Sequence, residues 1–70
     1  MMPLTMARVG EQNSIKKVGG KEETRAFLAT LGFVPGTHVT IVSALSGNVI
    51  VNVKESRVAI SREMAKKIMV

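Results

Sequence analysis

The residue types that most often carry catalysis are scarce in this chain. Its only histidine, His38, is flanked by Thr37 and Val39, and the sequence has no cysteine and no aspartate. A hydroxyl nucleophile needs a base that a third group orients, and no such group accompanies this histidine. Glu22 and Glu23 are adjacent, so on a helix they point to different faces and do not form a carboxylate pair. The sequence therefore predicts a protein that is not an enzyme, with His38 as an exposed strand residue.

Metal and cofactor sites are equally hard to assemble from these residues. One histidine and five glutamates, without cysteine or aspartate, do not supply a converging set of metal ligands. The five methionines are adaptable packing residues, and we expect them to fill the core rather than bind a soft metal. The segment GGKEETR lacks the spacing and the preceding apolar strand of a phosphate-binding loop. No metal ligand and no cofactor are predicted.

Binding through exposed side chains is the remaining chemistry. Barrels that bind single-stranded nucleic acid or proline-rich peptides use aromatic side chains, and this chain has only Phe27 and Phe33, with no Trp and no Tyr. Both phenylalanines are expected to be structural, because one lies on the apolar face of a predicted helix and the other follows that helix. Arg25, Arg57 and Arg62 are the side chains best suited to an acidic partner.

Composition limits the size and the compartment of the protein. The 70 residues are 46% hydrophobic and carry a net charge of +5. A chain of this length forms one domain, residues 1–70, and buries only about 60% of the surface that it exposes when unfolded. The net positive charge is +2 in residues 1–35 and +3 in residues 36–70. This even distribution predicts a solvated basic surface, and a small basic nucleic-acid-binding barrel is the alternative. No apolar run approaches the ~20 residues of a membrane-spanning helix and no secretory signal is recognisable, so we expect a cytoplasmic protein.

The first half of the chain predicts one strand and one helix. Residues 1–12 have no clean period and are expected to be an irregular lead-in, followed by a first strand over residues 13–18. Residues 21–31 favour a helix, because good helix formers surround an apolar cluster and the acidic Glu22 and Glu23 lie near the positive end of the dipole.

The sequence LGFVPGT ends this helix and starts the next strand. With Gly32 just beyond the helix, Phe33 and Leu28 are the pair that makes the hydrophobic contact of a Schellman motif. Pro35 and Gly36 fit the second and third positions of a type II turn, since the third position needs a positive φ. A helix stop fused to a tight turn is therefore expected.

The second half of the chain is predicted to be mainly β. Residues 37–44 and 49–54 form a hairpin, and residues 57–60 add a third antiparallel strand. Ser61 caps a short helix, and residues 69–70 return as a final edge. The expected apolar face of this helix consists of Met64, Ala65 and Ile68.

These elements predict a small, strongly bent antiparallel barrel. The expected class is mainly β, an SH3-like barrel with an inserted helix after the first strand and a short C-terminal helix. An OB-fold is the other candidate, although that fold usually needs a longer chain.

Three segments together resemble the FeoA family of ferrous iron transport proteins. They are LATLGFVPGTHVTIVSA, GNVIVNV and SRVAISREMAKKIMV, and the resemblance covers residues 4–70. The family implies an SH3-like barrel without catalytic activity. The same domain resembles a module of iron-responsive and manganese-responsive repressors, and the free-standing form is implied here. The positions that carry the resemblance are Leu31, Gly32, Pro35, Gly36, Ser56, Arg57, Ala59, Ile60 and Ala65.

The resemblance also implies a partner, the cytoplasmic GTP-binding part of the membrane ferrous iron transporter FeoB. The protein would be an accessory recruited to the inner face of the cell membrane, either as a regulator of nucleotide hydrolysis or as an assembly factor. No iron ligands transfer from the family to this sequence, and we expect no tight iron site.

The helix and the turn that follows it are the expected partner surface, because they decorate an otherwise minimal barrel. Weak self-association through an exposed sheet edge stays open as an alternative contact. The expected partner contacts are Arg25, Leu28, Leu31, Phe33 and Arg57. The residues expected to define the turn are Gly32, Pro35 and Gly36.

Overall fold

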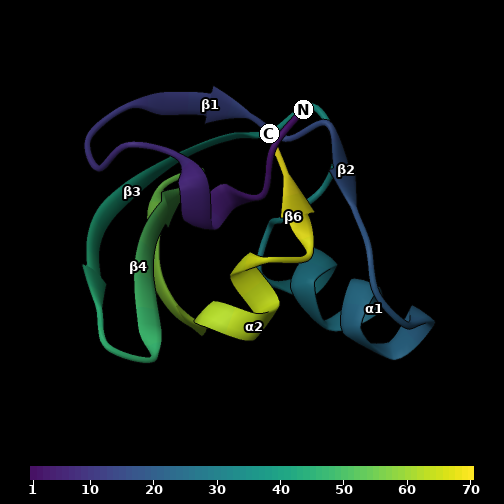
Figure 1. The fold of residues 1–70 in the computed structure, drawn as a ribbon. Helices are drawn as coiled ribbons and strands as arrows, with labels where there is room; N and C mark the ends of the chain where they lie inside the picture. Colours follow the sequence, from purple (N-terminus) through teal and green to yellow (C-terminus); the bar gives the residue numbers. More distant parts are fainter.

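The computed structural model describes residues 1–70 and contains six strands, two α-helices and one 3-10 turn (Figure 1). The order of these elements bears out the predicted alternation of short strands with one inserted and one late helix. In chain order they are η1 (Leu4–Met6), β1 (Gln12–Ser14), β2 (Lys17–Val18), α1 (Glu22–Thr30), β3 (His38–Leu45), β4 (Asn48–Val53), β5 (Ser56–Ser61), α2 (Arg62–Ala65) and β6 (Ile68–Met69).

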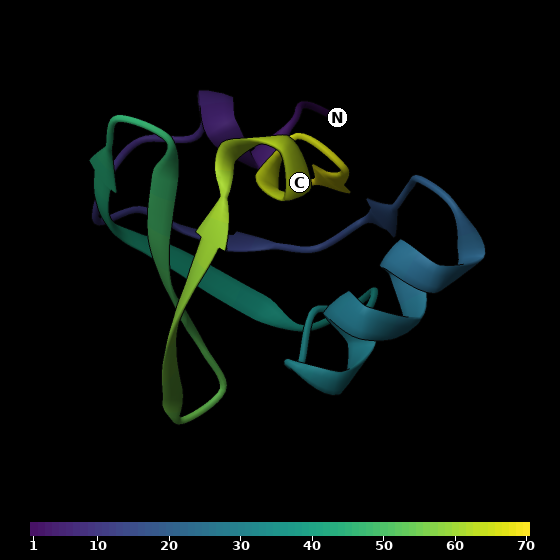
Figure 2. The same ribbon diagram turned by 90° about the horizontal axis from the view of Figure 1, so that it is seen from below.

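Four antiparallel strands in the order β1-β3-β4-β5 make the larger sheet. The predicted alternation in β4 is confirmed, because Val49, Val51 and Val53 are buried while the residues between them are half-buried. The pairing of β3 with β4 shifts register between Ile41 and Ser43. Such a bulge increases bend and twist, and Figure 2 shows the strands curling around the core.

The expected first strand over residues 13–18 is wrong in one respect, because the structure divides it into two strands of different sheets. The N–H of Ile15 donates to the carbonyl of Thr37 at 2.9 Å, which continues the pairing of β1 with β3. The next N–H, that of Lys16, donates to Met69 at 2.7 Å and begins the pairing of β2 with β6. This change of partner follows from the strong bend of the barrel, because one short straight strand cannot pair with both β3 and β6.

The lead-in contains more structure than expected. Leu4 lies in η1 and its side chain is fully buried. Met2 and Val70 exchange two backbone hydrogen bonds of 2.8 Å each, and Pro3 forms an isolated bridge with Met69. The two ends of the chain are therefore held side by side next to β6. Local sequence patterns could not reveal this contact, because its residues are far apart in the sequence.

One hydrophobic core of 13 buried residues holds the fold together, and it contains none of the five methionines. The expectation that methionine fills the core is wrong, since Met2 and Met64 only pack against it and Met1 and Met6 are exposed. Most of the core residues are valines and isoleucines, whose compact side chains occupy the interior of the barrel.

The C-terminal helix is shorter than expected. As predicted, Ser61 is the N-cap, and its hydroxyl accepts a hydrogen bond from the N–H of Met64 at 3.2 Å. The helix ends at Ala65, so Ile68 belongs to β6 rather than to the helix, where it is fully buried. The predicted return of the chain to a final edge is confirmed by the pairing of β6 with β2.

Candidate functional site

The end of α1 is built by the two features that the sequence predicts. The N–H of Gly32 donates to the carbonyl of Ala29, and the N–H of Phe33 donates to that of Leu28, both at 3.0 Å. This pattern is the Schellman motif. Gly32 has a φ of 103°, and the side chains of Leu28 and Phe33 both lie in the core. The helix therefore stops at a fixed place and is tied to the barrel beneath it.

The turn that follows is attached to the barrel as well. The N–H of Thr37 donates to Val34 at 3.1 Å, and Gly36 has a φ of 91°, which are the features of a type II turn with Pro35 at its second position. The N–H of Gly36 donates to the carbonyl of Ile15 at 2.8 Å. Helix and turn thus form one rigid projection, which we call the α1 projection and which comprises residues 22–37.

Two of the five expected partner contacts are not accessible. The side chains of Leu28 and Phe33 are 0% and 1% exposed, so their role here is to anchor the α1 projection to the core. Leu31 is half-buried and packs against the core, while Arg25 and Arg57 are exposed. The surface open to a partner is therefore smaller and more polar than the sequence suggested.

The structure does not bring the two arginines together. Arg25 lies on α1, whereas Arg57 lies on β5 and donates from Nε to Oδ1 of Asn52 on β4 at 3.3 Å. Figures 1 and 2 both place α1 and β5 on different sides of the molecule. A single acidic group of a partner therefore does not reach both guanidinium groups.

Phe27 is the surface residue that the sequence interpretation missed. Its side chain is 48% exposed, although its neighbour Leu28 is fully buried. Adjacent helical residues point about 100° apart, and α1 buries only one residue completely, so the apolar stripe continues past the core into solvent. Leu31 lies one turn further on the same side as Phe27, and the spacing of these two residues was the signal that could have identified an exposed apolar patch.

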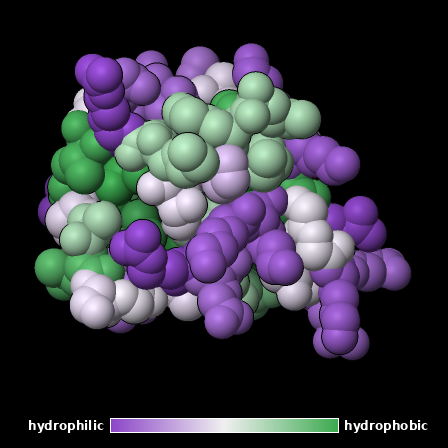
Figure 3. Space-filling model, in the orientation of Figure 1, coloured by the Kyte–Doolittle hydropathy of each residue, from purple (hydrophilic) through white to green (hydrophobic).

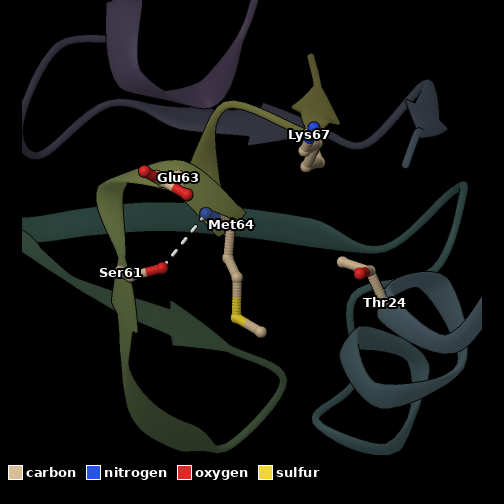
Figure 4. A pocket seen from close by; sticks show the side chains of 5 residues that line it. All are labelled: Thr24, Ser61, Glu63, Met64 and Lys67. Atoms are coloured by element: carbon tan, nitrogen blue, oxygen red, sulfur yellow. Dashed lines mark hydrogen bonds between the residues drawn. The ribbon is translucent and has the colours of Figure 1, made fainter. Parts of the chain in front are cut away.

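An open cleft of about 270 Å³ separates α1 from the end of β5 and α2 (Figure 4). The side chain of Met64 extends into it from α2, and Thr24 faces it from α1. The cleft presents two hydroxyls, a carboxylate, an ammonium group and a thioether, so it offers hydrogen-bond donors and acceptors beside one apolar side chain. Its lining consists of Thr24, Ser61, Glu63, Met64 and Lys67.

The remaining chemical candidates stay apart in the fold. His38 is exposed at the start of β3 opposite Ser14, and no three His, Cys, Asp or Glu side chains come together as metal ligands. Neither α-helix has the length and apolar character needed to cross a lipid bilayer.

Known proteins share both this sequence pattern and this geometry. Residues 2–70 match the FeoA domain family. A protein of Methanocaldococcus jannaschii named Fe(2+) transport protein A is 34% identical to this chain over 70 residues, which cover all of this chain and 85% of the relative.

Three solved structures have the same fold. A crystal structure of an iron uptake regulatory protein (FeoA) superposes with a TM-score of 0.88 at 22% identity, covering 96% of this chain and 91% of that one. The solution structure of the FeoA protein from Chlorobium tepidum gives 0.87 at 23% identity, covering 97% of this chain and 67% of that one. A manganese-dependent transcriptional repressor gives 0.83 at 14% identity, covering 94% of this chain and 38% of the repressor. The SH3-like barrel expected from the sequence is thereby confirmed, and the chain belongs to the FeoA domain family.

Proposed function

We propose that this chain is a non-enzymatic accessory protein of ferrous iron uptake that binds the cytoplasmic part of the membrane transporter FeoB and modulates it. The FeoA family takes part in ferrous iron uptake. The exposed apolar side chains support a binding role, because they offer surface for contact with another protein. No group of three possible metal ligands competes with this interpretation. The protein would act in the cytoplasm, at the inner face of the membrane that holds the transporter.

The observation that carries this proposal is the exposed apolar patch on the α1 projection. Phe27 and half-buried Leu31 lie next to each other on a helix that the core and the Schellman motif hold in place. Aromatic side chains on rigid supports lose little conformational entropy on binding and are enriched among residues that dominate interface energies. Arg25 points about 200° around the same helix from Phe27, so it would act on a partner that lies across Phe27 through long-range attraction.

The cleft beside the α1 projection extends this surface. Met64 adapts its shape to a partner, and Thr24 and Lys67 supply donors at its two walls. A polypeptide segment of the transporter that lies across Phe27 would enter the cleft between α1 and α2. We therefore place the partner contact on α1, the turn and this cleft, and leave Leu28 and Phe33 beneath it as supports.

The test is a titration of the isotopically labelled protein with the soluble GTP-binding domain of FeoB. We expect chemical-shift changes to concentrate in α1, in residues 32–37 and around the cleft. Phe27→Ala should weaken binding by roughly tenfold, because a central aromatic side chain of an interface often contributes that much. Arg25→Glu should weaken binding less and mainly by slowing association.

The matched control is Leu45→Ala, since Leu45 is also a large exposed apolar residue, at 61%, but lies on the distant β3–β4 hairpin. Equal binding of the wild type and Phe27→Ala, or an equal loss in Leu45→Ala, would contradict the proposed contact. Absence of binding by the wild type would contradict the partner itself.

A further inference from the structure

The five methionines lie on segments that are neighbours in the fold, although the side chain of Met64 extends from α2 into the cleft toward α1. Residues 1–3 and η1 contribute Met1, Met2 and Met6, while α2 and β6 contribute Met64 and Met69. The backbone bonds between Met2 and Val70 and the bridge from Pro3 to Met69 hold these segments together, and η1 also packs against α2. Figure 3 shows the result as a pale green area over the N-terminal segment and β6, viewed as in Figure 1.

The excess positive charge gathers on the same segments. Residues 1–7, 16–18 and 62–70 contain five basic side chains and one glutamate, which gives a charge of +4. The rest of the chain contains five basic and four acidic side chains and contributes only +1. The sequence shows an even surplus of positive charge in both halves, but the pairing of β2 with β6 places Lys17 opposite Met69 and diagonal to Lys67, which is two residues before Met69. We call these three segments the methionine–lysine face.

The register shows how the two residue types are mixed. Pro3, Met69 and Lys17 form one row across three neighbouring segments, because Met69 is the partner of both others. The N–H of Gly19 donates to Lys67 at 2.7 Å, which places Lys67 on the same outer side two residues along from Met69. Val18 and Ile68 occupy the other side, and Ile68 is fully buried. The outer side is therefore an unpartnered sheet face with thioethers between ammonium groups.

None of the lysines on this face is hydrogen-bonded within the protein. The three side-chain hydrogen bonds of the structure involve Thr30, Arg57 and Ser61 instead. The only side-chain carboxylate on the face is that of Glu63. The ammonium groups are thus free to bind anions supplied from outside, and their long apolar stems can lie flat beside the methionines.

We propose that the methionine–lysine face binds the anionic surface of a lipid bilayer. A bilayer surface offers a diffuse layer of phosphate groups above an apolar interior, which matches flexible lysines around exposed methionines. A specific acidic protein site would favour the planar fork of arginine, and Arg62 is the only arginine in these segments. Single-stranded nucleic acid would favour stacking on aromatic rings, and both phenylalanines lie in the α1 projection. Met1, Met6 and Met69 line no cleft, so an interlocking partner is a poorer match than a fluid surface.

This inference goes beyond the proposed function and does not depend on it. Phe27 on the α1 projection stays available for a transporter domain while the methionine–lysine face lies on lipid. The cleft residues Glu63, Met64 and Lys67 belong to both surfaces, so lipid and a polypeptide in the cleft would compete for them. The lipid contact would concentrate the protein at the membrane and raise its encounter rate with a membrane-bound partner.

The experiment is co-sedimentation of the tag-free protein with lipid vesicles and no transporter present. One set of vesicles contains phosphatidylcholine only, and in the other about a third of the lipid is phosphatidylglycerol. We expect binding only to the anionic vesicles, decreasing as salt screens the lysines. Lys17→Gln combined with Lys67→Gln should lower the partition coefficient by roughly 25-fold, since each lysine near an anionic surface contributes about fivefold. Met6→Ser, at a residue that is 69% exposed, should lower it several-fold without changing the circular dichroism spectrum.

The matched control removes the same charge elsewhere. Lys54 and Arg57 lie at the β4–β5 hairpin. The double variant Lys54→Gln with Arg57→Gln should change the partition coefficient by less than about threefold. Equal losses in the two double variants would overturn the proposal, because net charge alone would then explain binding. Equal binding to both kinds of vesicle, or binding to a DNA duplex that displaces the vesicles, would overturn it as well. Because no transporter is present, none of these outcomes bears on the contact of the α1 projection.

Discussion

The α1 projection and the methionine–lysine face are attached to the same barrel in different ways. Buried side chains hold the first, since Leu28 and Phe33 enter the core directly beneath the helix stop. The second combines buried side chains with strand pairing, because Leu4, Ala65, Ile68 and Val70 lie in the core and backbone hydrogen bonds of 2.7 Å from Lys16 to Met69 and 2.8 Å between Met2 and Val70 join its segments. A position that packs into the core has a restricted side chain, whereas an exposed position held by backbone pairing, such as Lys16, leaves its side chain free to carry a surface property.

This difference matters for function because each proposed contact needs a different kind of support. A helix that presents one aromatic side chain to a partner must hold that side chain in one orientation. A face that lies on fluid lipid needs only its charge and its apolar area, so flexible methionine and lysine side chains suffice. Substitutions in the two regions should differ in their effect on the free energy of unfolding, because the regions are anchored differently.

The largest effect is expected for Phe33→Ala, which should lower the free energy of unfolding by about 3–5 kcal/mol, because a fully buried aromatic side chain leaves a cavity. Met6→Ala, on the methionine–lysine face, should change the free energy by less than about 0.5 kcal/mol. Urea denaturation followed by circular dichroism measures both. If Phe33→Ala does not fold, Phe33→Leu provides the comparison with a loss of roughly 1 kcal/mol. Similar losses in Met6→Ala and in the Phe33 variant would contradict the difference in anchoring.

A pair of substitutions at Lys16 separates backbone from side chain on the methionine–lysine face. Lys16→Pro removes the N–H that donates to Met69 and restricts the conformation of Ile15, so it should cost about 2–3 kcal/mol. Lys16→Gln keeps this hydrogen bond and should leave stability within about 0.5 kcal/mol of the wild type. Thermal unfolding of the two variants gives the difference directly. If the glutamine variant were as unstable as the proline variant, the ammonium group rather than the backbone would hold this region.

The α1 projection could be predicted from the sequence because its signals are local. Gly32, Phe33, Pro35 and Gly36 lie within five residues and specify the helix stop and the turn by their own conformational preferences. The alternation of valine with other residues in β4 is a local signal as well, and it correctly predicted which face of that strand is buried. These patterns do not say how much of the apolar side of a short helix the rest of the protein covers. For this reason Phe27 was expected to be structural, although its side chain is 48% exposed.

The methionine–lysine face could not be predicted, because it exists only through pairing between distant residues. Lys17 meets Met69 across more than fifty positions, and no window of the sequence contains both. The split of residues 13–18 into two strands has the same origin, since the change of partner at Ile15 depends on where β3 and β6 lie. Methionine was assigned to the core from its general preference, but here the valines and isoleucines of the barrel already fill that volume.

Two glycines test how tightly the α1 projection is fixed to the barrel. Gly32→Ala should cost about 2 kcal/mol, because a φ of 103° disfavours alanine and its Cβ would lie 3.2 Å from Cγ2 of Val53. Gly36→Ala should cost about 1 kcal/mol, since its φ of 91° carries a similar strain but its Cβ would meet nothing within 4 Å. Chemical denaturation under identical conditions gives the difference. Equal losses would show that the close approach of Gly32 to β4 contributes nothing to the attachment.

The smallest effect concerns α2, the part of the methionine–lysine face that forms one wall of the cleft beside the α1 projection. Its four residues depend on the cap from Ser61, whose hydroxyl is bonded to the N–H of Met64. Ser61→Ala should therefore lower the free energy of unfolding by about 1 kcal/mol, whereas Ser46→Ala in the exposed β3–β4 turn should be nearly neutral. Hydrogen exchange of the Met64 amide distinguishes local from global effects. Faster exchange at Met64 with unchanged protection in β4 would show that α2 opens independently of the barrel, so that the cleft widens without loosening either anchored region. Loss of protection in both places would instead show that α2 is part of the support that the two regions share.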